Sequence, residues 1–135
     1  MPADPSITAE ILPFARLMGI ETLEATSKRI RLRLLVREDL CTSGGILHGG
    51  AIMALADTAG ALGAVQNLPE GAQTTTLESK ANFVGAARVG TEVTAEASPG
   101  HLGRRTSVWQ TRIEGDGGRL VAVVTQTQMV IEPRP

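Results

Sequence analysis

The chain has few of the residues on which disulfides, zinc sites and aromatic pockets depend. Its 135 residues include one cysteine, one tryptophan, two phenylalanines and no tyrosine. The single cysteine, Cys41, excludes an internal disulfide and a cysteine-rich zinc site, and no strong base close to it in sequence would activate its thiol. So few aromatic side chains also disfavour an aromatic-lined binding pocket.

A strong excess of charge of one sign is also missing. The chain carries 13 basic and 14 acidic residues, for a net charge of −1. Because this balance leaves no electrostatic footprint for nucleic acid or an anionic membrane, we expect neither as a partner. The first five residues lack the basic and apolar segments of a secretory signal, so we expect a cytoplasmic protein.

Length and composition together predict one domain. An apolar content of 42% is enough to bury an ordinary core in a chain of 135 residues. We therefore expect a single domain over residues 1–135, without a second domain for a cofactor.

The spacing of apolar residues predicts helices first and then strands. Near the N-terminus, despite Pro13, helical spacing predicts a short amphipathic helix that covers one edge of the core. Over 24–36 the period changes to two, which predicts one half-buried strand with a basic face in water. The residues proposed for the buried side of the helix are Ile7, Ile11, Phe14, Leu17 and Met18, and the later strands are expected at 73–83, 91–98, 104–114 and 119–131.

Between these regions, residues 51–66 are apolar on all sides apart from Asp57 and Thr58. A helix without a polar face lies in a protein core or in a membrane, and a membrane span needs about 20 apolar residues. This segment is shorter and contains a carboxylate, so it predicts a central core helix. The strands after it follow one another without intervening helices, which predicts an antiparallel sheet packed on that helix.

Asp57 is the most informative residue of this helix. A carboxylate among apolar neighbours is costly to bury unless it is paired, hydrogen-bonded or functional. It is therefore a candidate general base. The alternative is a structural aspartate that bonds a neighbouring strand.

A glycine-rich loop precedes the helix. Gly49 and Gly50 expose backbone N–H groups at the helix N-terminus, where free donors and the helix dipole favour a developing oxyanion. His48 stands at the junction of loop and helix. We favour a supporting role for it, as a hydrogen-bonding cap, over that of a general base.

The sequence Leu47-His48-Gly49-Gly50, followed by 51–60 with Asp57 among them, resembles the His-Gly-Gly…Asp signature of hotdog-fold acyl-CoA thioesterases of the phenylacetate-degradation and 4-hydroxybenzoyl-CoA type. The resemblance extends to 13–20, to 82–90 and to the final hairpin. It implies an α+β hotdog fold, in which a curved antiparallel sheet of five or six strands wraps around one central helix. It also implies hydrolysis of an acyl-CoA to a carboxylic acid and free coenzyme A, with no metal or prosthetic group.

The resemblance assigns roles to individual residues. Asp57 matches the catalytic carboxylate, as general base or as nucleophile, and the Gly49 N–H matches the donor that polarises the thioester carbonyl. His48 matches the motif histidine that shapes the site. Thr42 stands where many members have Asn or Gln, which leaves its role open. Thr76, or Thr75 if the strand is offset by one residue, falls near a hydroxyl that holds the attacking water in some members.

Other positions match the family's coenzyme A site. The segment after His101 resembles the place where the nucleotide of coenzyme A lies, and its two arginines are suited to phosphate. Paired arginines are otherwise typical of a solvated turn. The residues expected to contact substrate or coenzyme A are Gly50, Phe83, Gly103, Arg104, Arg105 and Thr106.

The spacing of Gly49 and Asp57 bears on assembly. Eight residues apart on one helix, they are separated by about 12 Å at ~1.5 Å per residue, whereas reacting groups must approach within about 3.5 Å. We therefore expect a homodimer with shared active sites, and a homotetramer as in much of the family. Two other functions stay open: a hotdog hydratase or dehydratase, and a non-catalytic acyl-CoA sensor. The acyl group cannot be read from the sequence.

Overall fold

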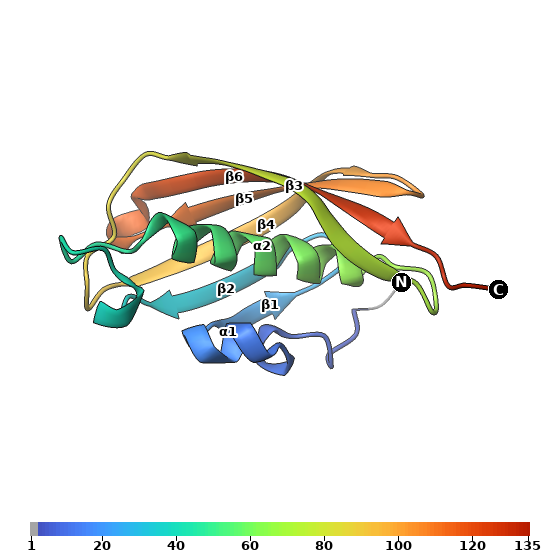
Figure 1. The fold of residues 1–135 in the computed structure, drawn as a ribbon, viewed down its shortest axis with the longest axis horizontal. Helices are drawn as coiled ribbons and strands as arrows, with labels where there is room; N and C mark the ends of the chain where they lie inside the picture. Colours follow the sequence, from blue (N-terminus) through green and yellow to red (C-terminus); the bar gives the residue numbers. More distant parts are fainter. Residues whose placement is uncertain (1–2) are drawn as a thin grey trace.

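The computed structural model describes residues 3–135, so Met1 and Pro2 of the predicted domain lie outside the described residues. One long helix, α2, lies against a sheet built from most of the remaining chain (Figure 1). The elements in chain order are η1 (Ala9–Ile11), α1 (Pro13–Met18), β1 (Glu21–Ala25), β2 (Ile30–Leu35), η2 (Glu38–Leu40), α2 (Gly49–Val65), β3 (Gln73–Phe83), β4 (Glu92–Leu102), β5 (Thr106–Glu114), η3 (Asp116–Gly118) and β6 (Leu120–Ile131).

The six strands form one antiparallel sheet in the order β1-β2-β4-β5-β6-β3. The sheet curves around α2, as Figure 1 shows. The predicted hotdog architecture is confirmed. Because β3 follows α2 in sequence but pairs with β6, the last strand, it occupies the edge of the sheet opposite β1. The chain therefore reaches α2 from β2, the strand next to one edge, and leaves it for β3 at the other edge.

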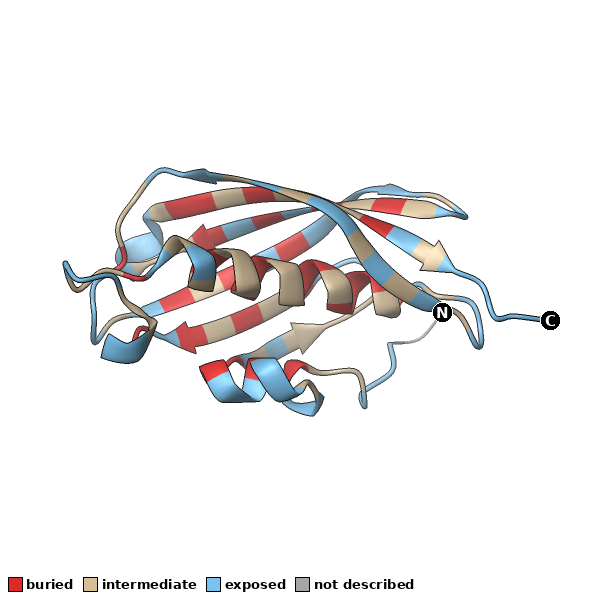
Figure 2. Ribbon diagram, viewed as in Figure 1, coloured by how far each residue is buried: buried red, intermediate tan, exposed pale blue. Residues whose placement is uncertain are grey.

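Small residues allow α2 to approach the sheet closely. A Cβ atom at Gly63 would lie 2.4 Å from the ring of Trp109 on β5, and one at Gly60 would lie 2.4 Å from the Gln126 amide carbon on β6. Side chains at either position would push the helix away from the strands. In Figure 2, buried positions alternate with less buried ones along the strands behind α2, where the helix packs on the sheet.

The segment 24–36 is two strands and not the single strand that we predicted. β1 and β2 form an antiparallel hairpin, and the chain turns between them at Thr26. The Thr26 hydroxyl oxygen accepts the N–H groups of Lys28 at 3.3 Å and Arg29 at 3.0 Å, which stabilises the turn. The inward period of two holds from Ile30 onward, where residues 30, 32, 34 and 36 are buried.

The N-terminal helix was predicted too long and with the wrong buried side. Leu12 has an extended backbone before Pro13, which separates η1 from α1, as expected for a residue that precedes proline. Ala9, Ala15 and Met18 are the buried side chains of these two elements. Of the residues proposed for the buried side, Ile11, Phe14 and Leu17 are exposed, with Leu17 at 72%.

The outer face of β1, β2 and β4 carries alternating charges. Arg33 lies 2.7 Å from Glu21 and 3.9 Å from Glu92, and Arg29 lies 3.0 Å from Glu96. The basic face predicted for β2 is therefore matched by acidic neighbours. Such exposed pairs contribute little stability individually, about 0–1 kcal/mol each. Over residues 3–135, no helix has the length and apolar character needed to cross a bilayer.

Candidate functional site

Asp57 is half-buried at the middle of α2, and side chains from two strands donate hydrogen bonds to one of its carboxylate oxygens. Thr76 on β3 donates its hydroxyl to Oδ1 at 2.6 Å, and Gln126 on β6 donates its amide Nε2 to the same oxygen at 3.1 Å. No side chain among residues 3–135 donates to Oδ2. Asp57 thus bonds neighbouring strands, as expected of a structural aspartate, yet one carboxylate oxygen stays available to a ligand or water.

β3 determines which of the two candidate threonines lies in the site. Its side chains alternate, so that Thr74 and Thr76 are half-buried and Thr75 is exposed. The register with β6 shifts after Thr76, at a bulge between Thr76 and Glu78. The structure therefore brings Thr76 to Asp57 and turns Thr75 away from it.

Two residues of the site, Gln126 and Gln128, were missed in the sequence. Both are buried on β6, with 0% and 1% of their surface exposed. Gln128 donates its Nε2 to the Thr76 hydroxyl at 2.7 Å. A signal was present, because the two glutamines continue the inward alternation of Ala122 and Val124, where apolar residues are the rule.

The N-terminus of α2 is capped by His48. Its Nδ1 accepts the N–H of Gly50 at 2.7 Å, as a helix cap does. Because Nδ1 is an acceptor, the proton of the neutral ring is on Nε2, which can then donate to a ligand and cannot act as its base. Gly49 is the first residue of α2, and its N–H has no partner within the helix by position.

Phe83, at the end of β3, lies beside that first turn. A Cβ at Gly49 would be 3.4 Å from the Phe83 ring, and the ring is 52% exposed. The structure therefore brings Phe83 to the helix N-terminus. Thr42 is exposed in the preceding loop, where its hydroxyl accepts the Gly44 N–H at 3.3 Å.

The other proposed coenzyme A residues, Gly103 to Thr106, lie in the turn between β4 and β5 and at the first residue of β5. Arg104 and Arg105 are exposed in the turn between β4 and β5. In Figure 1 this turn projects from the end of the sheet opposite to the first turn of α2. Within one chain, the arginines and Gly49 are therefore not brought together.

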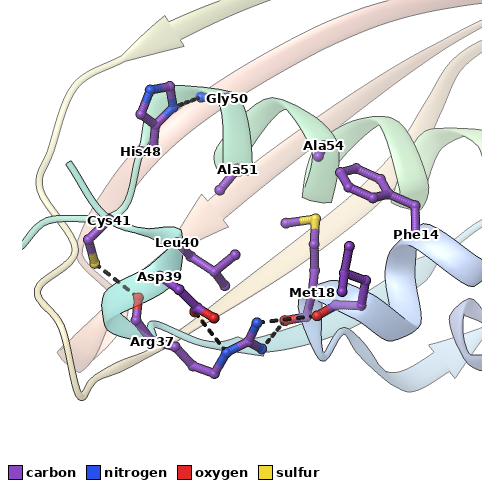
Figure 3. A pocket seen from close by; sticks show the side chains of 11 residues that line it. Phe14, Met18, Arg37, Asp39, Leu40, Cys41, His48, Gly50, Ala51 and Ala54 are labelled. Carbon is purple, nitrogen blue, oxygen red and sulfur yellow. Dashed lines mark hydrogen bonds and ion pairs between the residues drawn. The ribbon is translucent and has the colours of Figure 1, made fainter.

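An apolar cavity of about 420 Å³ lies between α1 and the first half of α2 (Figure 3). Its polar rim is already paired, because the Arg37 guanidinium donates to the Met18 carbonyl at 2.5 Å and to Asp39 at 3.1 Å. The Cys41 thiol, also in the lining, donates to the Arg37 carbonyl at 3.2 Å. The apolar lining consists of Phe14, Leu17, Met18, Leu40, Ala51 and Ala54, and His48 and Gly50 also line the cavity.

The chain is similar to thioesterases in both sequence and structure. The family model of the thioesterase superfamily matches residues 44–122. A 1,4-dihydroxy-2-naphthoyl-CoA hydrolase of Listeria monocytogenes is 30% identical over 117 residues, which cover 87% of this chain and 94% of that protein. Relatives from Vibrio cholerae and Haemophilus influenzae, named as esterases, are 43% and 41% identical, but the chain spans only 60% and 62% of their length.

Solved structures agree with these matches. A Haemophilus influenzae thioesterase superposes with a TM-score of 0.80 at 36% identity, covering 85% of this chain and 80% of that one. A thioesterase of Streptococcus pneumoniae, solved with coenzyme A, superposes with a TM-score of 0.77 at 25% identity, covering 86% and 88% of the two chains.

The cap hydrogen bond of His48 leads to a prediction about stability. Asparagine is among the best N-cap residues, so His48→Asn should keep the free energy of unfolding near that of the wild type, whereas His48→Ala should lower it by about 1 kcal/mol. Urea unfolding followed by circular dichroism measures both values. Equal stability of the two variants would contradict a capping role.

Proposed function

The chain belongs to the thioesterase superfamily, a family of thioester hydrolases, and we propose that it hydrolyses acyl-coenzyme A to a carboxylic acid and free coenzyme A. One observation carries the proposal: within residues 3–135, side chains bond Asp57 through Oδ1 only, on a helix whose first turn presents the Gly49 N–H. Two relatives support coenzyme A as the carrier. The Listeria protein is named for hydrolysis of an acyl-CoA, and the Streptococcus structure contains coenzyme A.

The proposed chemistry needs two features of this site. The Gly49 N–H donates to the thioester oxygen and stabilises the negative charge that develops there. Asp57 Oδ2 takes a proton from water as the water oxygen bonds to the carbonyl carbon. The C–S bond then breaks, and the proton on Asp57 passes to the leaving sulfur, which releases coenzyme A as its thiol. Alternatively, Oδ2 attacks the carbonyl carbon directly, and the C–S bond breaks to release the coenzyme A thiolate and leave an anhydride. Water then hydrolyses the anhydride to the carboxylic acid and the Asp57 carboxylate, and one proton passes to the thiolate. Both routes consume one water and leave Asp57 unchanged.

A single chain does not complete this site. Gly49 and Asp57 belong to one unbroken helix, α2, so eight residues at ~1.5 Å each separate them by about 12 Å. We propose that Asp57 acts on a thioester held by Gly49 of a second subunit, in a homodimer with two equivalent sites. β3 is suited to such pairing, because it is 11 residues long and lies at the edge of the sheet. A homotetramer would be a pair of such dimers.

The cavity beside α1 supports a substrate class. Its lining includes His48 and Gly50, next to the place proposed for the thioester, and extends along Ala51 and Ala54 to α1. Its wall is apolar, and its one arginine already donates to backbone carbonyls and to Asp39. We therefore propose that it takes the acyl group, and that this group is apolar and uncharged.

Complementation between subunits tests the shared site. Asp57→Asn keeps an acceptor for Thr76 and Gln126 but removes the base, so turnover should fall at least ~100-fold without loss of folding. Gly49→Pro removes the N–H at the first helical position, where proline is well tolerated. Its turnover should also fall ~100-fold. Heterodimers of the two inactive variants, purified through different tags, should regain about half of the wild-type rate, since one of two equivalent sites is intact.

Turnover of acyl-CoA is the measurement in each case. Heterodimers as inactive as their parents would contradict the shared site. A folded Asp57→Asn protein with wild-type turnover would contradict the proposed function. A protein that binds acyl-CoA without any turnover would instead be an acyl-CoA sensor.

The role of the arginines in the β4–β5 turn is tested by comparing substrates with and without the nucleotide of coenzyme A. Replacing both Arg104 and Arg105 by alanine should raise KM for acyl-CoA about tenfold with little change in kcat, because phosphate contacts far from the reacting bond contribute uniform binding. Kinetics on an acyl-pantetheine without the nucleotide should scarcely change. Arg112, an exposed arginine on β5, provides the matched control variant Arg112→Ala. If the double variant lost the same activity on acyl-CoA and on acyl-pantetheine, Arg104 and Arg105 would instead support the fold.

Residues of the cavity should set the preferred acyl length. Ala54→Leu narrows the cavity and should lower kcat/KM for long acyl-CoAs about tenfold or more, given ~0.8 kcal/mol for each buried methylene. Leu17→Ala widens it at an exposed position and should shift the preference toward longer chains. Turnover of acetyl-CoA, whose acyl group is too short to fill the cavity, should change little. If Ala54→Leu and Leu17→Ala both kept the wild-type preference for acyl length, the cavity would not be the acyl site.

A further inference from the structure

Two buried glutamines have no role in the chemistry described so far. Gln126 and Gln128 lie on the inner face of β6, with 0% and 1% of their surface exposed, among apolar neighbours. A primary amide in such a place is costly unless its hydrogen bonds are made. In Gln126 this cost is not fully offset, because its Oε1 has no hydrogen-bond partner among residues 3–135. An apolar residue would fill the same position at lower cost, which indicates that the amides are kept for what their Nε2 groups bond.

The donors of this network point in one direction. Gln128 Nε2 donates to Thr76 Oγ1 at 2.7 Å, and Thr76 Oγ1 donates to Asp57 Oδ1 at 2.6 Å. An amide nitrogen can only donate, and a hydroxyl has one proton, so the Thr76 proton is directed to Asp57. On the far side of Gln128, the Thr74 hydroxyl lies 3.0 Å from the Gln128 Oε1 and 3.0 Å from the Met129 carbonyl, so Oε1 is one of two acceptors within its reach.

Gln126 completes the set from the other side. Its Nε2 lies 3.1 Å from Asp57 Oδ1 and 3.5 Å from the Asp57 backbone oxygen. This approach depends on Gly60, one turn further along α2, because a Cβ there would lie 2.4 Å from the Gln126 amide carbon. The helix, the glycine and the glutamine therefore fit together around one carboxylate oxygen.

We infer that Gln126 and Gln128 are positioning residues that occupy Oδ1 of Asp57 and thereby assign Oδ2 as the oxygen that reacts. Gln126 does so directly, and Gln128 does so by orienting the Thr76 hydroxyl. Rotation of the carboxylate plane would break both hydrogen bonds to Oδ1, so Oδ2 is the oxygen left without a donor among residues 3–135. The inference rests on the proposed function of Asp57, and positioning of this kind acts on the chemical step and not on substrate binding.

The test uses methionine, which is close to glutamine in length and has no amide donor. Gln128→Met should lower kcat for acyl-CoA about tenfold with KM nearly unchanged, since the interaction matters only as the transition state forms. Gln126→Met should do the same. Gln126→Met should not be less stable than the wild type, because the amide it replaces is partly unsatisfied. Gln128→Met removes an amide that is bonded at both ends and should be slightly less stable, so urea unfolding is measured beside kcat. Gln128→Leu replaces Gln128→Met if that variant does not fold.

A double-mutant cycle separates positioning from packing. Thr76→Val removes the hydroxyl through which Gln128 acts, so adding Gln128→Met to it should lower kcat no further. Gln126→Met should still lower kcat in that background, because Gln126 contacts Asp57 itself. Thr76→Ser, which keeps the hydroxyl, should retain more activity than Thr76→Val. Thr111→Val is the matched control, because this buried hydroxyl on β5 has no bond to Asp57 and kcat should not change.

The outcomes are distinguishable from failure of the function itself. Wild-type kcat in Gln128→Met, with Asp57→Asn inactive, would overturn the positioning role and leave the proposed function intact. If Gln128→Met lowered kcat equally in the wild-type and Thr76→Val backgrounds, the glutamine would act through packing of the sheet. That result would also overturn the positioning role. Full turnover by Asp57→Asn would instead remove the proposed function on which the inference rests.

Discussion

The close approach of α2 to β5 and β6 is the constraint on which the rest of the structure depends. Gly63 lets the helix lie against the Trp109 ring, and Gly60 lets it lie against the Gln126 amide. At a wider separation, Asp57 could not reach a donor on β6, and its carboxylate would face an apolar sheet without hydrogen bonds. The same approach brings α2 against five of the six strands, so that one helix organises the core.

A polar network inside an apolar core is the second consequence. Asp57, Thr76, Gln126 and Gln128 form hydrogen bonds where the neighbouring inward positions are alanine and valine. Stability alone would favour apolar residues there, because burying amides and a carboxylate gains little over good packing. A site of this kind, costly for folding and specific in geometry, is typical of a functional centre.

The spacing of apolar residues predicted those helices and strands in which the spacing is regular over many residues. The core helix and the strand over 73–83 were located correctly, since each carries its period over many residues. The β1–β2 hairpin was missed, because a turn made by the Thr26 hydroxyl carries neither glycine nor proline. The buried side of the N-terminal segment was also wrong, because Leu12 and Pro13 divide a spacing that looked continuous.

The sequence by itself determined that a carboxylate stands in an apolar helix behind a His-Gly-Gly turn, and that an antiparallel sheet must cover that helix. These features depend on neighbours a few residues apart. Only the tertiary structure decided that Thr76 and not Thr75 meets Asp57, and that Gln126 and Gln128 complete its surroundings. Gln126 is 69 residues from Asp57, and Gln128 is 52 residues from Thr76. Such contacts are set by sheet order and register, which place β6 beside β3 and under α2, and no local pattern encodes that placement.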